Sequence, residues 1–325
     1  MRSLRLVTQP ASRMAVSLLM CGLLAIGGDA MAAAANYPTQ PIKLFVVGEA
    51  GGGSDLVGRL IAGALSKRLG QPIEIQNTAS GDGNEAAMAV VRAKPDGYTL
   101  LVDFTFHILN PALQASQPYD PIKDFTPITM LATNVTTLAV RSDHPAKSVA
   151  DLIALARQKP GGLSTAVVNG SVTHMASELL LAQAGIDVKR VPSAGNPQSI
   201  KDLLGGNVDD TFATVNVVLP AMKAGTLRVL GVTEPKRFEV LPDVPTIAET
   251  LPGYSVSGFY GLIGPRGLPP EVVATLNKAT REVLADPEVR TWLVQRGSQI
   301  APTTPQEYVT FLSTEIAKWQ KVFKK

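Results

Sequence analysis

The sequence predicts an α/β protein with two lobes that are joined by crossing strands. The chain has 325 residues, which is enough for about two domains. Short apolar runs alternate with helical patterns along most of its length, and this alternation is typical of parallel sheets covered by helices on both faces. No low-complexity linker divides the chain, so the two domains are expected to share crossing strands.

The alternation begins at residue 42 and continues to the C-terminus. Gly70 is expected to end the first helix, and Ser148 is expected to cap a later one. The predicted strands span residues 42–47, 73–76, 98–102, 138–141, 164–167, 188–191, 211–213 and 227–232. The predicted helices span residues 55–69, 84–93, 149–158, 174–184, 198–204, 217–224, 270–285 and 305–323.

The first 35 residues are predicted to be a secretory signal peptide with cleavage within residues 32–35. Arginines precede an apolar stretch over residues 15–26, which is shorter than the ~20 residues of a membrane-spanning helix. The only cysteine, Cys21, lies in this segment, so the mature chain has no disulfide and no cysteine ligand for a metal. Removing three Arg and one Asp changes the net charge from +3 to +1, which argues against a nucleic-acid-binding protein.

Three adjacent glycines stand where the first strand gives way to the first helix. The sequence there is VVGEAGGGSDLVG, and Ser54 is a plausible helix cap. Bare backbone N–H groups at a helix N-terminus bind carboxylates or phosphates, and glycine lets such a ligand approach closely. A tight turn alone would explain the glycines equally well.

A second loop, AVVNGSVTHMASELL, has the same composition. Asn169, Gly170, Ser171 and Thr173 lie between a predicted strand and a predicted helix, and His174 lies at the helix start. Helix capping alone would explain Ser171 or Thr173. Ligands of α/β proteins bind at the carboxyl ends of strands, where both loops are expected.

Enzyme and metal sites find little support. Gly81, Gly83 and Ala86 with Asp103 imitate a dinucleotide fingerprint, but the glycines start late after the strand and the helix is short. There is no G-x-S-x-G motif of a hydrolase. The histidines at positions 107, 144 and 174 are too widely spaced for a zinc motif, so each is expected to be buried or to cap a helix.

Several longer stretches resemble the substrate-binding proteins of tripartite tricarboxylate transporters, the Bordetella-uptake-gene family. They include YPTQPIKLFVVGEAGGGSDLVGRLIAGALSKRLGQPIEIQN, KPDGYTLL, YDPIKDFTPI, DLLGGNVD and LPDVPTIAETLPGY, and the resemblance covers essentially all of the mature chain in order. It implies a Venus flytrap of the type II kind with a ligand cleft between two lobes. Lobe 1 would comprise residues 36–136 and 256–325, and lobe 2 residues 137–255.

The resemblance also implies a function. A periplasmic, monomeric binding protein without cofactor or catalysis would capture a small carboxylate and deliver it to a permease of one large and one small membrane subunit. A periplasmic sensor that presents its ligand to a signalling receptor is the alternative, and an exported enzyme is a remote one.

The candidate ligand-binding residues are carried over from the family's two loops. They are Ala50, Gly51, Gly52, Gly53, Ser54 and Asp55 in the first loop, and Asn169, Gly170, Ser171, Thr173 and His174 in the second. Ser193 and Thr214 stand where the family has Tyr and Asn, and Phe104 and Thr105 stand where it has small polar residues. With Glu49 beside the first loop, these changes favour a monocarboxylate or weakly charged ligand with an apolar or aromatic body over citrate. The alternative is that Phe104 and Phe106 pack within their own lobe and Glu49 faces solvent.

Overall fold

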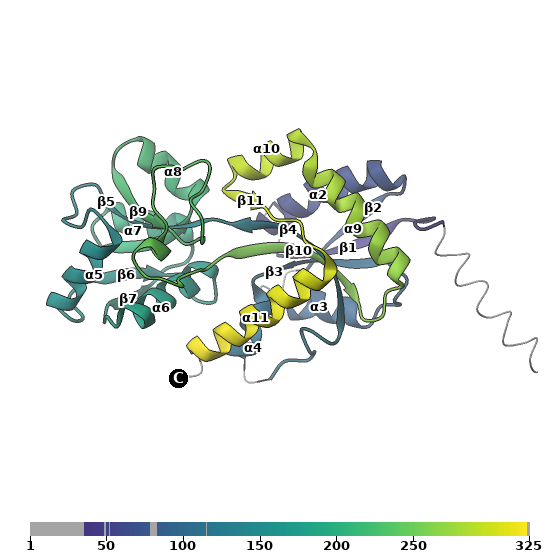
Figure 1. The fold of residues 1–325 in the computed structure, drawn as a ribbon, viewed down its shortest axis with the longest axis horizontal. Coiled ribbons are helices and arrows are strands. Elements are labelled where there is room, and N and C mark those ends of the chain that lie inside the picture. The colour runs from purple at the N-terminus through teal and green to yellow at the C-terminus, as the bar shows by residue number, and fades with distance from the viewer. Residues whose placement is uncertain (1–35, 49, 52, 79–82, 115, 324–325) are drawn as a thin grey trace, which may run out of the picture.

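Two β-sheets form the centres of two lobes that lie side by side along the long axis of the molecule (Figure 1). The computed structural model describes residues 36–323 of the chain except residues 49, 52, 79–82 and 115. The predicted signal peptide lies outside the described residues. The two α/β lobes confirm the predicted fold class.

The sheet of the first lobe has six strands in the order β11-β4-β10-β3-β1-β2. Its strands are β1 (Ile42–Val47), β2 (Ile73–Thr78), β3 (Thr99–Phe104), β4 (Phe125–Asn134), β10 (Gly258–Pro265) and β11 (Ser298–Ile300). The helices around it are α2 (Gly53–Leu69), α3 (Asn84–Val91), α4 (Phe106–Leu113), α9 (Pro270–Ala285), α10 (Pro287–Gln295) and α11 (Pro305–Phe323).

The sheet of the second lobe has five strands in the order β7-β6-β8-β5-β9. Its strands are β5 (Thr136–Arg141), β6 (Ser164–Val167), β7 (Lys189–Pro192), β8 (Asp210–Thr214) and β9 (Leu227–Val232). The helices are α5 (Val149–Gln158), α6 (Val172–Ala184), α7 (Asn196–Leu204) and α8 (Val215–Lys223), and a 3₁₀ turn covers Ile247–Glu249.

Both sheets are mixed, so the expectation of parallel sheets is confirmed for some strand pairs and wrong for others. β1, β2 and β3 are parallel, but β10 lies antiparallel between β3 and β4. The reason is the crossing itself. β4 leads directly into β5 of the second lobe, and β10 brings the chain back, so it enters the first sheet from the opposite direction (Figure 1).

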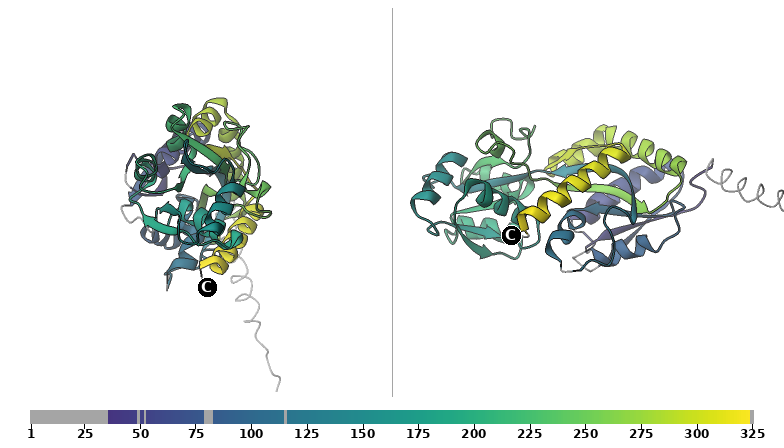
Figure 2. Two further views of the ribbon diagram at one scale, coloured as in Figure 1. Left: turned by 90° about the vertical axis from the view of Figure 1, so that its left-hand side faces the viewer. Right: turned by 60° about the horizontal axis from the view of Figure 1, so that its bottom comes forward.

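Helices cover both faces of the first sheet. Val57 and Ile61 of α2 and Leu276 of α9 pack with strand residues such as Leu44 and Leu262 on one face. On the other face, α3, α4 and α11 cover the sheet, and a second view shows α11 lying along the molecule with its C-terminal end at the junction of the lobes (Figure 2). This second layer therefore reaches from one lobe to the other.

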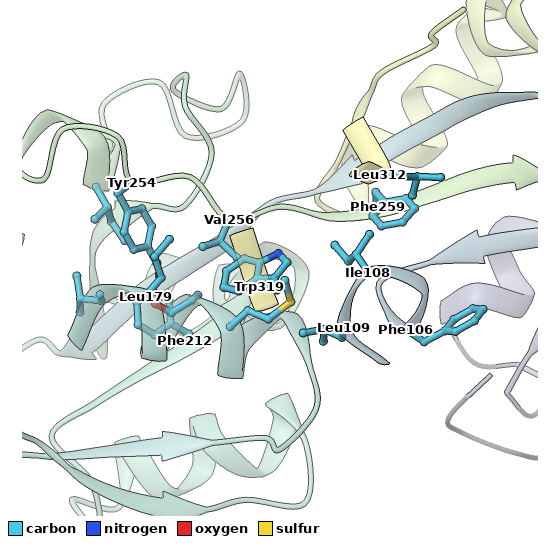
Figure 3. Packing of buried hydrophobic residues seen from close by; sticks show 14 of the residues in the cluster. Phe106, Ile108, Leu109, Leu179, Phe212, Tyr254, Val256, Phe259, Leu312 and Trp319 are labelled. Atoms are coloured by element: carbon cyan, nitrogen blue, oxygen red, sulfur yellow. Dashed lines mark hydrogen bonds between the residues drawn. The ribbon is translucent and has the colours of Figure 1, made fainter. Parts of the chain in front are cut away.

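One hydrophobic cluster spans the junction. Trp319 near the end of α11 is fully buried between Leu179 and Phe212 of the second lobe and Leu109 of the first (Figure 3). Burial of a side chain of this size contributes several kcal/mol at ~25 cal/mol per Å² of apolar surface. The lobes are thus connected by packed side chains as well as by the two crossing segments.

Most predicted elements are present, several with the predicted bounds, namely β1, β6, β9, α5, α9 and α11. The predicted cap is also present, because the Ser148 hydroxyl accepts a 3.1 Å hydrogen bond from the Asp151 amide. The sequence interpretation missed β4, α4, β10, α10 and β11. Among the described residues, no helix is both long and apolar enough to cross a bilayer.

Candidate functional site

A cavity of about 260 Å³ lies between the lobes, and residues of both line it. The first turn of α2 contributes Gly53, Leu56 and Val57, and the start of α8 contributes Thr214 and Asn216. The first four N–H groups of a helix have no partner within it and carry a partial positive charge. Two such helix ends at one cavity favour an anionic ligand.

The loop before α2 is held by its own carboxylate. The Asp55 side chain, 2% exposed, accepts hydrogen bonds from the amide of Gly51 at 2.8 Å and from Asn77 Nδ2 at 3.0 Å. Gly51 has a φ of +87°, in the left-handed region that favours glycine. The Gly51 amide is therefore occupied, and the Asp55 carboxylate fixes the loop rather than facing the cavity.

Arg59, one turn further along α2, completes this arrangement. Its Nε lies 2.8 Å from Asp55 Oδ2, and this hydrogen bond lowers the pKa of Asp55 against the opposing effect of burial. The charge of Asp55 is thus compensated locally. Ala50 is exposed and Ser54 half-buried, while Gly52 and Glu49 lie outside the described residues.

The crossing strands supply a polar wall. Asn134 at the end of β4 accepts a 2.9 Å hydrogen bond from Ser298 Oγ, and both residues line the cavity with Tyr260. A Cβ on Gly53 would lie 3.4 Å from the Tyr260 hydroxyl, so that phenol reaches the start of α2. Burial raises the pKa of Tyr260, so it is a protonated hydrogen-bonding group at neutral pH.

A chain of backbone contacts joins the lobes at the floor of the cavity. The Val135 amide donates to the Gly297 carbonyl at 2.9 Å, and the Val215 amide donates to the Val135 carbonyl at 3.2 Å. Gly297 has a φ of +80°, and a Cβ there would lie 3.3 Å from the Asn216 amide nitrogen. Gly297, two residues after the end of α10, therefore lies directly against the N-terminus of α8.

The second predicted loop forms the N-terminal cap of α6, and none of its residues lines the cavity. The Ser171 hydroxyl accepts from the His174 amide at 3.3 Å and contacts Thr173 Oγ1 at 2.8 Å, which confirms the capping interpretation. The Gly170 amide donates to His174 Nδ1 at 3.3 Å. Asn169 is exposed at the tip of the loop.

A distant part of the chain packs against His174. Its ring centroid lies 5.4 Å from that of Phe323 at the end of α11, and burial lowers its pKa, so the imidazole is neutral at pH 7. Its Nε2 lies 3.9 Å from Glu178 Oε1. The role of this loop in ligand binding stays a prediction.

The remaining candidates lie apart from the cavity with one exception. Thr214 lines it and accepts from Asn196 Nδ2 at 3.3 Å. Ser193 Oγ donates to the Gly195 carbonyl at 3.3 Å. The ring of Phe104 lies edge-on to the ring of the buried Phe106, with 4.9 Å between the ring centroids.

Thr105 begins α4, since its carbonyl accepts from the amides of Ile108 and Leu109. The structure therefore gives Phe104 and Thr105 packing and helix-starting roles, and their contact with ligand remains a prediction. His107 is buried, as expected, with Nε2 2.6 Å from the Pro121 carbonyl.

Sequence reasoning missed the contribution of α10 to the cavity. Trp292 and Arg296 line it, and the guanidinium carbon of Arg296 lies 3.9 Å from the centre of the Trp292 ring. A local signal existed, because Asp286 followed by Pro287 is typical of a helix start and Gly297 of a helix stop. That signal predicts the helix but not that it faces a cavity.

Comparison with known proteins places this geometry in a family. Residues 57–325 match a family model described as the tripartite tricarboxylate transporter family receptor. The chain is 30% identical over 300 residues to the protein BugT of Bordetella pertussis (strain Tohama I), which covers 91% of this chain and 92% of BugT.

Two solved structures are similar throughout. Rpa4515 of R. palustris with adipate is 35% identical with a TM-score of 0.74, covering 89% of this chain and 97% of that one. MatC (Rpa3494) from Rhodopseudomonas palustris with bound malate is 32% identical with a TM-score of 0.71, covering 88% of this chain and 100% of that one. Both neighbours contain small carboxylates.

Proposed function

This chain belongs to the tripartite tricarboxylate transporter receptor family, and we propose that it binds a small organic acid as its carboxylate for such a transporter. The family consists of transport receptors rather than enzymes, in agreement with the prediction that the chain is not an enzyme. The adipate and malate of the two neighbours are the acids with which the proposal begins.

One observation carries the proposal: the cavity between the lobes is built to receive negative charge. The N-termini of α2 and α8 reach it from different lobes, and Arg296 is its one cationic lining residue among those the structure describes. No Asp or Glu of the described chain lines it. A carboxylate there would be stabilised by the partial positive charge of both helix ends.

Lobe closure is the proposed mechanism. We divide the chain at the crossings, with residues 36–136 and 256–325 in one lobe and residues 137–255 in the other. A ligand that contacts Gly53 of one lobe and Asn216 of the other makes more contacts when the lobes approach, so it selects the closed state. The signal peptide would place this event in the periplasm, and the closed monomer would then dock on the large and small permease subunits.

Calorimetry with adipate, malate and citrate tests the proposal on the purified mature chain. We expect stoichiometric binding of at least one of these acids, and a free energy of unfolding raised by about 2.7 kcal/mol at 100 times its Kd. Failure of all three acids to bind or stabilise the protein would refute the carboxylate assignment.

A pair of asparagine variants locates the site. Asn216→Ala removes an exposed amide at the cavity, and Asn207→Ala removes an exposed amide elsewhere in the same lobe. Loss of a hydrogen bond to a charged ligand costs about 1.5–3 kcal/mol, so Asn216→Ala should weaken binding at least tenfold. Equal affinities of the two variants would place the ligand outside this cavity.

A further inference from the structure

Two groups of polar residues line the cavity. The first is formed by the Tyr260 hydroxyl and the start of α2 at Gly53. The second is formed by Arg296 of the first lobe and Asn216 of the second. Gly297, the residue after Arg296, lies against α8, because a Cβ on Gly297 would lie 3.3 Å from the Asn216 amide nitrogen. The cavity thus offers polar groups from both lobes to one ligand.

Stacking orients Arg296, which has no acidic partner among the described residues. Its guanidinium stacks on the ring of Trp292, one helical turn earlier, with the guanidinium carbon 3.9 Å from the ring centre. Within the described chain, the guanidinium makes one hydrogen bond, a long one of 3.4 Å from Nη1 to the Trp292 carbonyl. The guanidinium makes no ion pair with a described acidic residue. Stacking therefore orients the planar donor fork, and no described residue accepts a hydrogen bond from Nε or Nη2.

Three lining side chains are apolar, and they lie in the same cavity as the polar Asn134, Thr214 and Ser298. Leu56, in the first turn of α2, is 42% exposed, and it lines the cavity with Val57 and the half-buried Trp292. An exposed leucine and a half-buried tryptophan that line one cavity favour a ligand with an apolar body.

We propose that Arg296, stacked on Trp292, binds a second carboxylate of the ligand and thereby selects an acid with two anionic ends and an apolar body. One carboxylate lies at the start of α2 near Tyr260. The other forms a bidentate ion pair with the Arg296 guanidinium beside the N-terminus of α8, and the methylene or aromatic body lies against Leu56 and Trp292. This inference rests on the proposed function, because it assigns a ligand class to the same cavity.

The test compares adipate with hexanoate, which has the same carbon chain but a single carboxylate. We expect the wild-type protein to bind adipate at least tenfold more tightly, and Arg296→Gln to remove this preference by weakening adipate about 10- to 100-fold while leaving hexanoate unchanged. Arg296→Lys keeps the charge without the planar fork and should give an intermediate preference. Arg281→Gln, the same change on α9 away from the cavity, should keep the wild-type preference.

Fluorescence supplies a local readout. The chain has two tryptophans, Trp292 at the cavity and the fully buried Trp319, so adipate should change the emission of the wild-type protein but not that of Trp292→Phe. The inference is overturned if Arg296→Gln keeps the preference for adipate, or if hexanoate binds the wild type as tightly as adipate. Absence of binding of both acids, with malate or citrate bound, would overturn the inference alone; absence of all four would overturn the proposed function too.

Discussion

The carboxylate of Asp55 accepts a 2.8 Å hydrogen bond from the amide of Gly51, four residues earlier in the chain. The glycine-rich loop is therefore closed on itself before any ligand arrives. This preorganisation reduces the conformational entropy that ligand binding would otherwise have to offset.

Asp55→Asn should destabilise the protein by about 2 kcal/mol and weaken carboxylate binding, because one of the donors around this buried group then faces an amide N–H. The pKa of Asp55 is lowered in the folded state, so its contribution is present above the unfolded pKa of ~3.9 and is lost as pH falls through the folded pKa. Urea denaturation at pH 7 and pH 3 should show the difference between variant and wild type shrinking at the lower pH.

The control for Asp55 is Asp143→Asn, since Asp143 is also paired with an arginine but is 71% exposed. Water screens the charges of an exposed ion pair, so this variant should differ little from wild type. Equal effects of the two substitutions would show that Asp55 does not organise the loop.

Gly297→Ala should destabilise the protein more than Gly267→Ala. Both glycines have a left-handed φ, +80° and +85°, so each substitution carries a similar backbone strain of about 1–2 kcal/mol. A Cβ on Gly297 would also lie 3.1 Å from Val215 Cβ, whereas nothing lies within 4 Å of a Cβ on Gly267. Thermal unfolding of both variants measures the contact between α10 and α8 directly, and equal losses would argue against it.

His174→Ala should lower the melting temperature and leave the affinity for adipate within about twofold. The imidazole accepts the Gly170 amide and packs against Phe323, contacts worth about 1–2 kcal/mol together. A tenfold loss of affinity with unchanged melting temperature would instead assign His174 to the ligand, as the resemblance implied.

Glu234, between β9 and the returning chain, should make the protein less stable as pH rises. Its carboxyl accepts a 2.5 Å hydrogen bond from Ser257, and burial raises its pKa to about 7, with Thr133 and Lys318 opposing the shift and Glu315 adding to it. A carboxyl whose folded pKa is raised is protonated in the folded state and ionised in the unfolded state between the two pKa values. The free energy of unfolding should thus fall by up to about 3 kcal/mol between pH 4.5 and pH 7.

Glu234→Gln removes this titration while keeping a side chain of the same shape that can accept from Ser257. The variant should show a smaller fall in stability over this range, and at pH 8 it should be more stable than wild type, as measured by urea denaturation. Parallel pH profiles of the two proteins would show that Glu234 is ionised in the folded state near its ordinary pKa.

Local patterns of the sequence determined the repeating α/β units. The bounds of β1, α5, α9 and α11 and the caps at Ser148 and Ser171 follow from short-range periodicity and hydrogen bonds within a few residues. The position of the glycine-rich loop at the start of α2 was predictable for the same reason.

Only the tertiary structure decided how those units share a cavity. β10 reads as a turn-rich segment because it has three glycines and a proline, yet Gly261 is needed there because any Cβ would overlap the Tyr308 hydroxyl of α11. Its antiparallel insertion depends on the chain returning from the second lobe.

The cavity itself combines Gly53, Tyr260, Asn216 and Arg296, which lie far apart in sequence. Neither hydrophobic periodicity nor a motif records such proximity, because it results from the packing of two lobes around crossing strands. The tertiary structure also decided that the Asp55 carboxylate binds its own loop, since the same residue at a helix start could have faced either the ligand or the loop.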